Sequence, residues 1–429
     1  MVSHRVTVFI VAAILLVTGF TLISNSSKEN KVQNTLLQDK IKEIELELKA
    51  KDNQLTALSS SAESNAASTA SEIEIKEERY QRQIEELKLQ LAKSSLSHDK
   101  FSGTELKNSY YLKKTIIRDL PEYERTIYTI PEFETTDNNL IILTSIGHSE
   151  SYGPKRTFND FYKLLVGLEF DKSKATLGLL VGSKEEYLII EKYIENLTSE
   201  KSEQFSKIIL IQSYFIEELY NFDRGSRHAL NVQKERRRAI SRSRNFLLSS
   251  ALTDEYYTLC IDSDMIEIPK NVISIFENSQ KDIVVPRIRK GLAENYDFNS
   301  WVGTRKSPTA EEDAQLDQDP NYVYVPMPDQ AQHMHELFHS RENTGKLDYS
   351  VKLDSVGGAV LWAKSEIFKQ GVNFPFYYVI GTKWNRFEGF DGIETEGVCY
   401  LAEKIGYKCW GMPNLIAWHV DEFGVDPEI

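Results

Sequence analysis

Beyond about residue 100, short apolar segments alternate with longer segments in which apolar residues recur every three or four positions. The apolar segments are 139–146, 175–182, 207–212, 256–261, 282–288 and 357–363, and the helical patterns include 157–168, 184–196 and 227–252. Short apolar runs are typical of strands buried on both faces, and the periodic segments are typical of helices that cover a sheet. The alternation predicts an α/β domain with a mixed, mostly parallel sheet.

The chain begins with a different pattern. Residues 6–23 form an uncharged, mainly apolar run that is long enough to cross a bilayer as a helix. No good small-residue cleavage site follows, so the run predicts an uncleaved transmembrane signal anchor with residues 1–5 as a cytosolic tail. Its short length suits the thin membranes of the early secretory pathway. The rest of the chain is then expected to be luminal.

Residues 24–100 are predicted to form a coiled-coil stem. Apolar residues recur at alternating steps of four and three over 37–58 and resume over 73–91, with a polar joint at 59–71 between the two runs. This is the heptad pattern of helices that pack against a partner helix. The alternative is a solvated, charged helix whose periodicity is accidental. Residues 101–429 are expected to be a single luminal catalytic domain.

Two aspartates, Asp262 and Asp264, follow the apolar segment 256–261. Ligands of open α/β sheets bind at the carboxyl ends of strands, and this is such an end. Residues two apart in an extended segment project to the same side, so both carboxylates would face one cavity. A hard divalent cation that also bridges phosphate oxygens would neutralise them. The alternative is ordinary turn chemistry, because a bare Asp-x-Asp is common.

A histidine is expected at the same edge of the sheet, and an acidic cluster stands at the start of a later helix. His419 ends a late apolar segment, and an imidazole suits Mn²⁺ better than Mg²⁺. Asp391, Glu394 and Glu396 stand at the start of a predicted helix over 394–405. These acids either complement the helix dipole or hold sugar hydroxyls through charge-assisted hydrogen bonds.

The predicted helix 227–252 is strongly basic. It leads into the strand that ends at Asp262, so its N-terminal end would lie at the ligand-binding edge and its C-terminal end at the opposite edge. Arg227 is therefore the expected phosphate-binding cation. Arg236 and Arg244 are expected to form structural pairs, because a buried arginine needs an anionic partner.

The sequence HELFH at 335–339 matches the H-E-x-x-H pattern of zinc proteases. In that pattern the two histidines bind zinc and the glutamate, here Glu336, acts as the base. The segment lies in a polar insert between strands, however, and a zinc protease also needs a third ligand downstream in a helical domain. A zinc metalloprotease is therefore only a distant alternative.

Charge and cysteine content narrow the class of protein further. A net charge of −13 argues against a nucleic-acid partner. Three cysteines are too few for a disulfide scaffold, and the spacing of Cys399 and Cys409 leaves their pairing open. Asn196 begins an Asn-Leu-Thr sequon and is the predicted glycosylation site of a luminal domain.

Several blocks of sequence resemble the fungal Golgi mannan polymerase subunits, glycosyltransferase family 62. In chain order they are RHALNVQKERRRAISRSRN, DSDMIEIP, YDFNSW, LDSVGGAVLWAKSEIFKQGVNFPFY, IETEGVCYLAEKIGY and GMPNLIAWH. The resemblance implies a type II membrane protein of the cis-Golgi with a Rossmann-like GT-A fold. Other subunits of this family are then expected to bind the stem and the luminal domain.

The activity that the resemblance implies is transfer of mannose from GDP-mannose, in α-1,6 linkage, to the outer-chain mannan backbone of N-linked glycans. Asp262, Asp264 and His419 match the family's Mn²⁺-binding positions, and Glu394 is predicted to be catalytic together with the two aspartates. The residues predicted to bind substrate are Arg227, Gly357, Gly358, Asp391 and Glu396. The alternative from another class is a non-catalytic scaffold subunit of the same complex.

An α-linked donor and an α-linked product imply that the configuration of the sugar is retained. Double displacement would need a carboxylate nucleophile, and no acid in the sequence declares itself for that role. Asp262 and Asp264 are assigned to the metal, and Glu394 begins a helix. We therefore expect the departing GDP to take the acceptor's proton, with the metal and Arg227 stabilising the leaving charge.

Overall fold

The computed structural model describes residues 104–105, 110–119, 122–130, 133, 139–197, 203–213, 230–294, 296–319, 322, 324–386 and 388–421. All of them belong to the unit Phe101–Ile429. The predicted signal anchor 6–23, the predicted stem 24–100 and Arg227 lie outside the described residues. Within the described ranges, no helix is long and apolar enough to cross a membrane.

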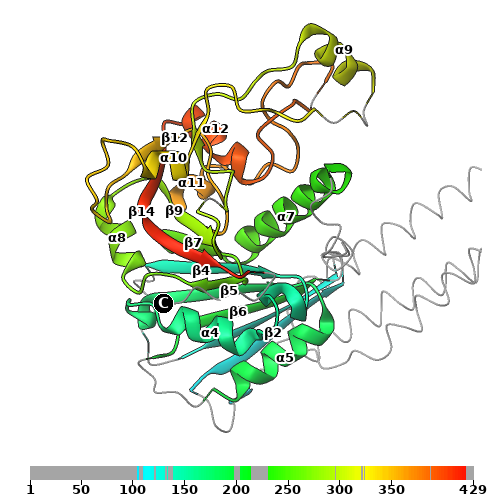
Figure 1. Cartoon of the computed structure of the whole chain (residues 1–429). Helices are drawn as coiled ribbons and strands as arrows, with labels where there is room; N and C mark the ends of the chain where they lie inside the picture. The colour runs from blue at the N-terminus through cyan, green and yellow to red at the C-terminus, as the bar shows by residue number, and fades with distance from the viewer. Residues whose placement is uncertain are drawn as a thin grey trace, which may run out of the picture. The chain divides into compact units, whose positions relative to one another are not determined.

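One large mixed sheet organises these residues (Figure 1). Its strands are β1 Thr104–Glu105, β2 Leu112–Asp119, β3 Glu122–Thr129, β4 Leu140–Ile146, β5 Ala175–Val181, β6 Lys207–Ser213, β7 Tyr257–Ile261, β8 Met265–Glu267, β9 Ile283–Lys290, β12 Val351–Leu353, β13 Val360–Lys364 and β14 Cys409–His419. They lie in the order β1-β2-β3-β6-β5-β4-β7-β13-β9-β14-β12, with β8 paired to β14. The prediction of a mixed α/β sheet is confirmed.

Parallel pairing is concentrated at the centre of this sheet. Strands β6, β5, β4 and β7 pair in parallel, as do β9 and β14. The flanking pairs are antiparallel, including β7 with β13 and β13 with β9. The carboxyl ends of β4, β5, β6 and β7 therefore meet at one edge of the sheet, which is where α/β sheets bind ligands.

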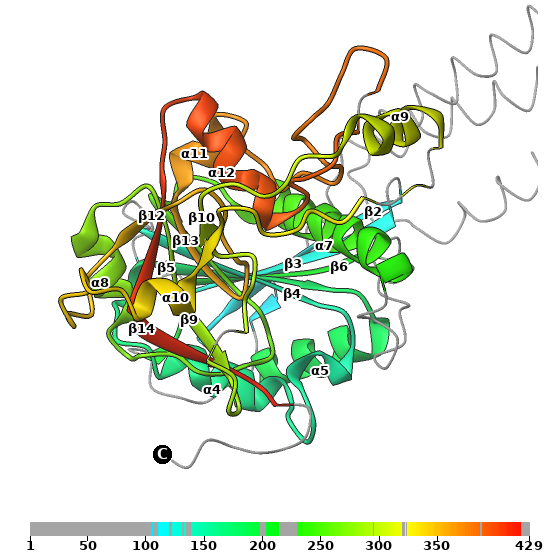
Figure 2. The same ribbon diagram turned by 45° about the horizontal axis from the view of Figure 1, so that its top comes forward.

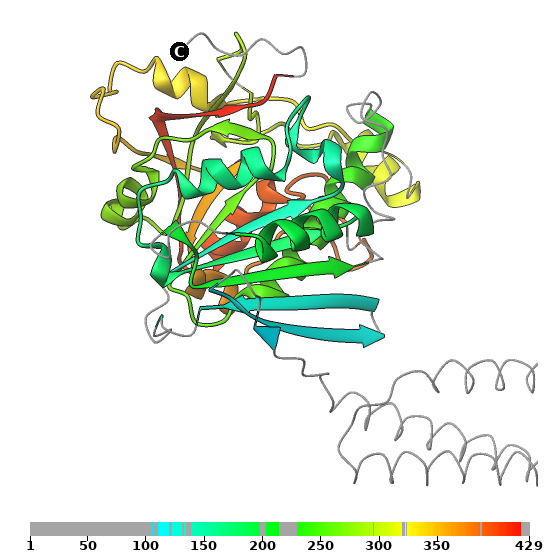
Figure 3. The same ribbon diagram turned by 90° about the horizontal axis from the view of Figure 1, so that it is seen from below.

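Helices cover both faces of the sheet (Figures 2 and 3). One face carries α4 (Phe158–Val166) and α5 (Lys184–Glu195), and the other carries α7 (Leu230–Ala251), α11 (Ser365–Lys369) and α12 (Thr395–Lys404). Alternate residues of β4 serve the two cores, with Ile142 in the first and Ile141 in the second. Burial on both faces explains why the central strands read as continuous apolar runs.

Shorter elements complete the described chain. They are the helices α8 (Val272–Ser279), α9 (Ala310–Gln318) and α10 (Met334–Phe338), the 3-10 helices η3 (Ser149–Tyr152) and η4 (Lys172–Lys174), and a two-stranded sheet of β10 (Trp301–Val302) and β11 (Gln332–His333). Most of them belong to the insert between β9 and β12. This insert brings additional polar side chains to the edge of the sheet near the end of β7.

Cys399 and Cys409 form a disulfide, with their Cα atoms 5.8 Å apart. The bond ties α12 to the first residue of β14. Cys260, in β7, is a free and buried cysteine. The spacing of Cys399 and Cys409 left their pairing open, and the structure shows that they are paired.

Removing the disulfide with Cys399→Ser is expected to lower the free energy of unfolding by about 3 kcal/mol, because the bond restricts the unfolded chain over a loop of this size. Denaturant titration with and without reductant measures the loss. Cys260→Ala is the control, since its stability should respond to reductant as the wild type does. Three titratable thiols in the unreduced, denatured wild type, instead of one, would contradict the pairing.

Candidate active site

Asp262 and Asp264 lie in the turn that joins β7 to β8. The Asp262 N–H donates to the Ala359 carbonyl at 2.9 Å, and the Val420 N–H donates to the Asp264 carbonyl at 2.9 Å. The turn is thus bonded to the segment before β13 and to the end of β14. The side chain of Ser263, between the aspartates, turns away and donates to the Ser151 carbonyl at 2.9 Å. The segment is therefore a hydrogen-bonded turn, and it also places both aspartates at the same edge of the sheet.

His419 lies beside Asp264. Its Nε2 is 3.0 Å from Asp264 Oδ2, and its Nδ1 is 2.8 Å from the Val420 carbonyl. A carbonyl oxygen only accepts hydrogen bonds, so Nδ1 carries a proton and Nε2 faces the carboxylate. Burial alone would lower the pKa of His419, but the charge and hydrogen bond of Asp264 outweigh it and raise the pKa.

The side chains predicted to bind metal form two neighbouring pairs. Asp264 contacts His419, and Asp262 contacts Arg244. In the described part of the chain, no group of three histidine, cysteine or acidic side chains is arranged to hold a metal ion. The donor set of two carboxylates and one imidazole nonetheless fits Mn²⁺ chemically. The hydrogen bond from His419 Nδ1 to the Val420 carbonyl also leaves Nε2 free to act as the metal ligand. A metal-binding histidine usually has this orientation.

Arg244, from the middle of α7, occupies the centre of the candidate site. Its Nη2 donates to Asp262 Oδ1 at 2.8 Å and to the Gly358 carbonyl at 3.1 Å. Its Nη1 lies 3.4 Å from Glu394 Oε1. Arg244 was expected to form a structural pair away from the ligand-binding edge. Its partners are instead two predicted catalytic carboxylates, because the long side chain reaches from the helix to the end of β7.

Gly357 and Gly358 make room for two charged side chains. A Cβ on Gly358 would lie 2.1 Å from Arg244 Nη1, and a Cβ on Gly357 would lie 1.4 Å from Asp297 Oδ2. Any side chain at these positions would displace the guanidinium or the carboxylate. The structure thus gives the two glycines, which were predicted to bind substrate, a role in shaping the site.

Asp297 is a candidate site residue that the sequence reasoning missed. It is half-buried, and desolvation together with the nearby acids Glu394 and Asp262 raises the pKa of Asp297 to about 6. Partial desolvation and the neighbouring acids also raise the pKa of Asp262, against the opposing effect of Arg244. The one sequence signal for Asp297 was its place in the block YDFNSW, which has no periodicity of its own.

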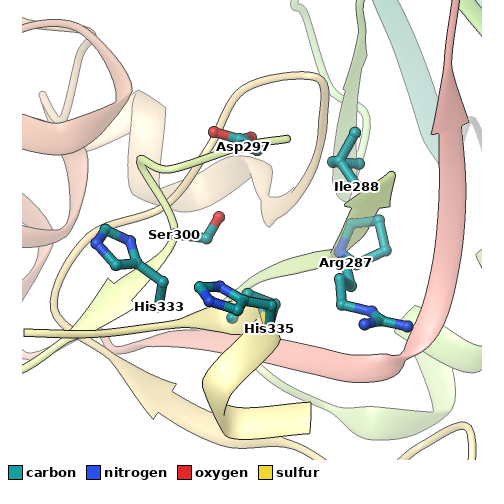
Figure 4. A pocket seen from close by; sticks show the side chains of 8 residues that line it. Arg287, Ile288, Asp297, Ser300, His333 and His335 are labelled. Atoms are coloured by element: carbon teal, nitrogen blue, oxygen red, sulfur yellow. The ribbon is translucent and has the colours of Figure 1, made fainter. Parts of the chain in front are cut away.

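A small cavity adjoins Asp297 (Figure 4). Asp297 and Ser300 line one part of it and His333 and His335 another, whereas the guanidinium of Arg287 points away. The two histidine rings lie 6.2 Å apart and nearly parallel. These imidazoles therefore belong to the surroundings of the candidate site.

The HELFH segment does not have the geometry of a zinc protease. Helix α10 ends at Phe338, so His339 lies beyond it. The Glu336 carboxylate accepts the backbone N–H of His333 at 2.6 Å and caps the helix. His339 Nε2 lies 3.0 Å from Glu294. The glutamate and the second histidine are thus engaged in local contacts.

Asp391 and Glu396 are bound by two arginines. Arg305 contacts both carboxylates, through Nε to Asp391 at 2.9 Å and Nη1 to Glu396 at 3.0 Å. Arg237 Nη1 donates to Glu396 at 2.9 Å. Burial acts to raise the pKa of Glu396, but the two arginines lower it to about 2. This arrangement favours a supporting role for the two acids over the direct sugar contact that the sequence predicted.

Glu394 has an unusual backbone conformation at the start of α12. Its φ is 59° and its ψ is −131°, a region that residues other than glycine rarely adopt. The residue is buried, and its N–H donates to the Pro375 carbonyl at 2.7 Å. The surrounding structure therefore imposes this conformation and holds the carboxylate beside Arg244.

The predicted glycosylation site is compatible with the structure. Asn196 follows α5 as its C-cap and is exposed, with Nδ2 donating to the Lys192 carbonyl at 2.7 Å. Thr198, the third position of the sequon, lies outside the described residues. Attachment of a glycan would leave one N–H on Nδ2, so this hydrogen bond can persist.

The strain at Glu394 is testable by comparing Glu394→Gly with Glu394→Ala. Glycine should give the more stable variant, because it adopts this conformation without the cost of about 1–3 kcal/mol for other residues. Thr309, the N-cap of α9 with φ of −64°, is the matched control for the ordinary difference between glycine and alanine at a cap. Equal glycine–alanine differences at the two positions, measured by denaturant titration, would rule out strain at Glu394.

Comparison with known sequences supports the resemblance. The model of the Anp1 family matches residues 119–378. The mannan polymerase complex subunit MNN9 of Candida albicans is 24% identical over 332 residues, which are 72% of this chain and 83% of that protein. The mannan polymerase I complex VAN1 subunit of Saccharomyces cerevisiae is 32% identical over 205 residues, which are 46% of this chain and 36% of that protein. The mannan polymerase complex subunit mnn9 of Schizosaccharomyces pombe is 26% identical over 283 residues, covering 62% of this chain and 78% of that protein.

Solved structures give weaker likenesses. GalNAc-T7 with UDP, GalNAc and Mn²⁺ aligns with a TM-score of 0.36 and 10% identity, over 68% of this chain and 44% of that chain. Mouse xyloside xylosyltransferase 1 aligns with a TM-score of 0.30 and 11% identity, over 66% and 85% of the respective chains. TM-scores this low do not assign the chain to a family. The family assignment rests on the sequence comparisons. The Anp1 family model covers more than half of the residues of this chain, and the chain therefore belongs to the Anp1 family.

Proposed function

We propose that the protein is a GDP-mannose-dependent α-1,6-mannosyltransferase that extends the outer-chain mannan backbone of N-linked glycans as a subunit of a mannan polymerase complex. The observation that carries the proposal is the charged cluster at the ends of β7 and β14, where Arg244 lies between Asp262 and Glu394. A nucleoside diphosphate leaving group needs a cation close to acids that can hold a metal, and Arg244 and the neighbouring aspartates supply both. Membership of the Anp1 family, with relatives named as mannan polymerase subunits, supports the choice of sugar.

In this proposal Asp262, Asp264 and His419 hold a divalent cation, with Mn²⁺ as the first candidate. When bound, the cation would neutralise the diphosphate of the donor. Nε2 of His419 must be unprotonated to serve as a ligand, so cation binding would release the proton that His419 shares with Asp264. The side chain of Asp262 is 44% exposed, which leaves it accessible to a donor at this edge.

The chain's own residues would orient the donor and stabilise the leaving group. Arg244 is the cation placed beside Asp262, and we assign it the stabilisation of the departing phosphate. Glu394, held next to Arg244, would position the acceptor hydroxyl by a charge-assisted hydrogen bond. The departing phosphate oxygen would accept the hydroxyl proton on the same face of the sugar, so the configuration is retained without a covalent sugar–enzyme bond.

The same proposal places the domain in the lumen of the cis-Golgi, as a type II membrane protein with the anchor 6–23 and the stem 24–100. The Cys399–Cys409 disulfide supports it, because disulfides persist in the oxidising compartments of the secretory pathway. The exposure of Asn196 is also consistent with luminal glycosylation. Partner subunits would bind through the stem and the luminal domain.

A second candidate is a non-catalytic scaffold subunit, and one observation favours it. Both carboxylates of the Asp-x-Asp turn already have a counter-charge from the protein, with Arg244 beside Asp262 and His419 beside Asp264. Carboxylates that already have a counter-charge from the protein can be purely structural. Such a subunit would not turn over the donor by itself but would still support the activity of its partners.

Metal dependence separates the two candidates. Asp264→Asn in the full-length protein is expected to weaken Mn²⁺ binding, measured by calorimetry, and to lower mannose transfer by about 10²–10³-fold. Asp254→Asn is the control, because Asp254 is exposed in the loop before β7, at the opposite end of that strand. Transfer at the full rate in the presence of a chelator would eliminate the metal from the mechanism.

The assigned role of Arg244 gives a further test. Arg244→Lys should lower turnover by about 10²-fold, because lysine cannot bridge two carboxylates as the planar guanidinium does. Mass spectrometry of the wild type incubated with GDP-mannose should detect no mannose adduct. A stable adduct on Glu394, Asp391, Glu396 or Asp297 would replace the proposed mechanism with double displacement.

A further inference from the structure

The described residues of the segment 380–391, which are 380–386 and 388–391, form a narrow two-stranded finger that the proposed reaction does not use. Its chain doubles back on itself through bridges between Ile380 and Asp391 and between Lys383 and Arg386. Trp384 stands at the turn with a relative exposure of 104%, so its indole lies clear of the rest of the domain. Figure 2 shows the segment as the orange loop beside α9.

Ion pairs along its length hold the finger to the rest of the domain. Arg386 is buried and donates through Nη2 to Asp313 of α9 at 2.8 Å, with Nη1 3.1 Å from Asp317. Lys383 contacts the same two acids. On the other side of the finger, Glu388 binds Arg238 of α7 at 2.7 Å. The tip is thus anchored to both α9 and α7.

The backbone is also closely packed at the base of the finger. A Cβ on Gly389 would lie 1.8 Å from the Ile380 carbonyl oxygen, and a Cβ on Gly381 would lie 2.3 Å from the Phe390 ring. Two glycines therefore allow the strands of the finger to approach. A loop that is held by several contacts while its largest side chain faces solvent is typical of a binding element.

The finger is continuous with the candidate active site. Its second strand ends at Asp391, which Arg305 links to Glu396, and Glu394 follows three positions later. Trp384 lies seven positions before Asp391, so it stands at most about 25 Å from that residue along an extended chain. A polymeric substrate whose end is in the active site could extend over that distance.

We infer that Trp384 is a stacking platform for the sugar chain of the acceptor, which rests on the proposed function and extends it to a second contact with the substrate. A pyranose ring offers an apolar C–H face that covers an indole, while its hydroxyls need hydrogen-bonding groups beside it. The tip supplies such groups in Thr382 and Asn385, which are exposed on either side of Trp384.

A protein partner fits the tip less well than a saccharide. Hot-spot tryptophans of protein interfaces lie at the centre of desolvated apolar patches. The tip residues next to Trp384 are Lys383 and Asn385, both polar and exposed. An isolated aromatic ring among hydrogen-bonding side chains matches the alternating apolar and hydroxyl surface of a sugar chain.

The test uses the full-length protein and an α-1,6-linked mannotetraose as the probe. Trp384→Ala should weaken binding of the probe, measured by calorimetry, and raise the acceptor KM, each about tenfold, with the KM for GDP-mannose unchanged. Trp384→Phe should restore most of the binding. Tyr256→Ala is the matched control, because Tyr256 is also highly exposed but lies at the opposite end of β7 from Asp262.

The outcomes separate this inference from the proposed function. Unchanged probe binding in Trp384→Ala overturns the inference, whether or not mannose transfer persists. Loss of co-purifying subunits with normal probe binding also overturns it and assigns the tip to a protein contact. A wild type that binds the probe through Trp384 but transfers no mannose would instead overturn the proposed mannosyltransferase activity and leave the sugar-binding platform in place.

Discussion

The candidate site depends on the attraction between one guanidinium and the carboxylates around it. Asp262 and Glu394 contact Arg244 directly, and Asp297 lies close enough to both acids for their charges to help raise its pKa. Like charges in a partly buried site repel strongly unless a counter-charge is present. Removing Arg244 would leave these acids to protonate or to move apart, so its position determines the shape of the cluster.

A second set of ion pairs holds the helix that carries Glu394. Arg305 and Arg237 bind Asp391 and Glu396 at the beginning of α12, and this fixes the helix that carries Glu394. Buried ion pairs contribute little net stability, because desolvation offsets their attraction. Their value here is geometric, since they confine α12 to one arrangement and allow Glu394 to keep a conformation that the backbone disfavours.

Local sequence patterns predicted the features that depend on local chemistry. The strands β4, β5, β6 and β7 were recognisable because burial on both faces requires continuous apolar runs. The edge position of Asp262, Asp264 and His419 followed from their places at strand ends. The site roles of Arg244 and Asp297 could not be predicted, because they arise from contacts across 18 and 60 positions to Asp262 and Gly357. The pair Gly357 and Gly358 was the one sign of those contacts in the sequence. It indicates that side chains pack closely against the backbone there, but it does not say which ones.

The contacts of Gly358 and Asp262 with Arg244 have a further consequence for entropy. An arginine side chain loses about 2 kcal/mol of rotamer freedom when it is fixed in one conformation. Arg244 is already fixed by the Asp262 carboxylate and the Gly358 carbonyl before any substrate arrives. The loss of rotamer entropy of Arg244 therefore occurs during folding and not during ligand binding. A ligand meets a preorganised positive charge, and binding to it loses no further side-chain freedom.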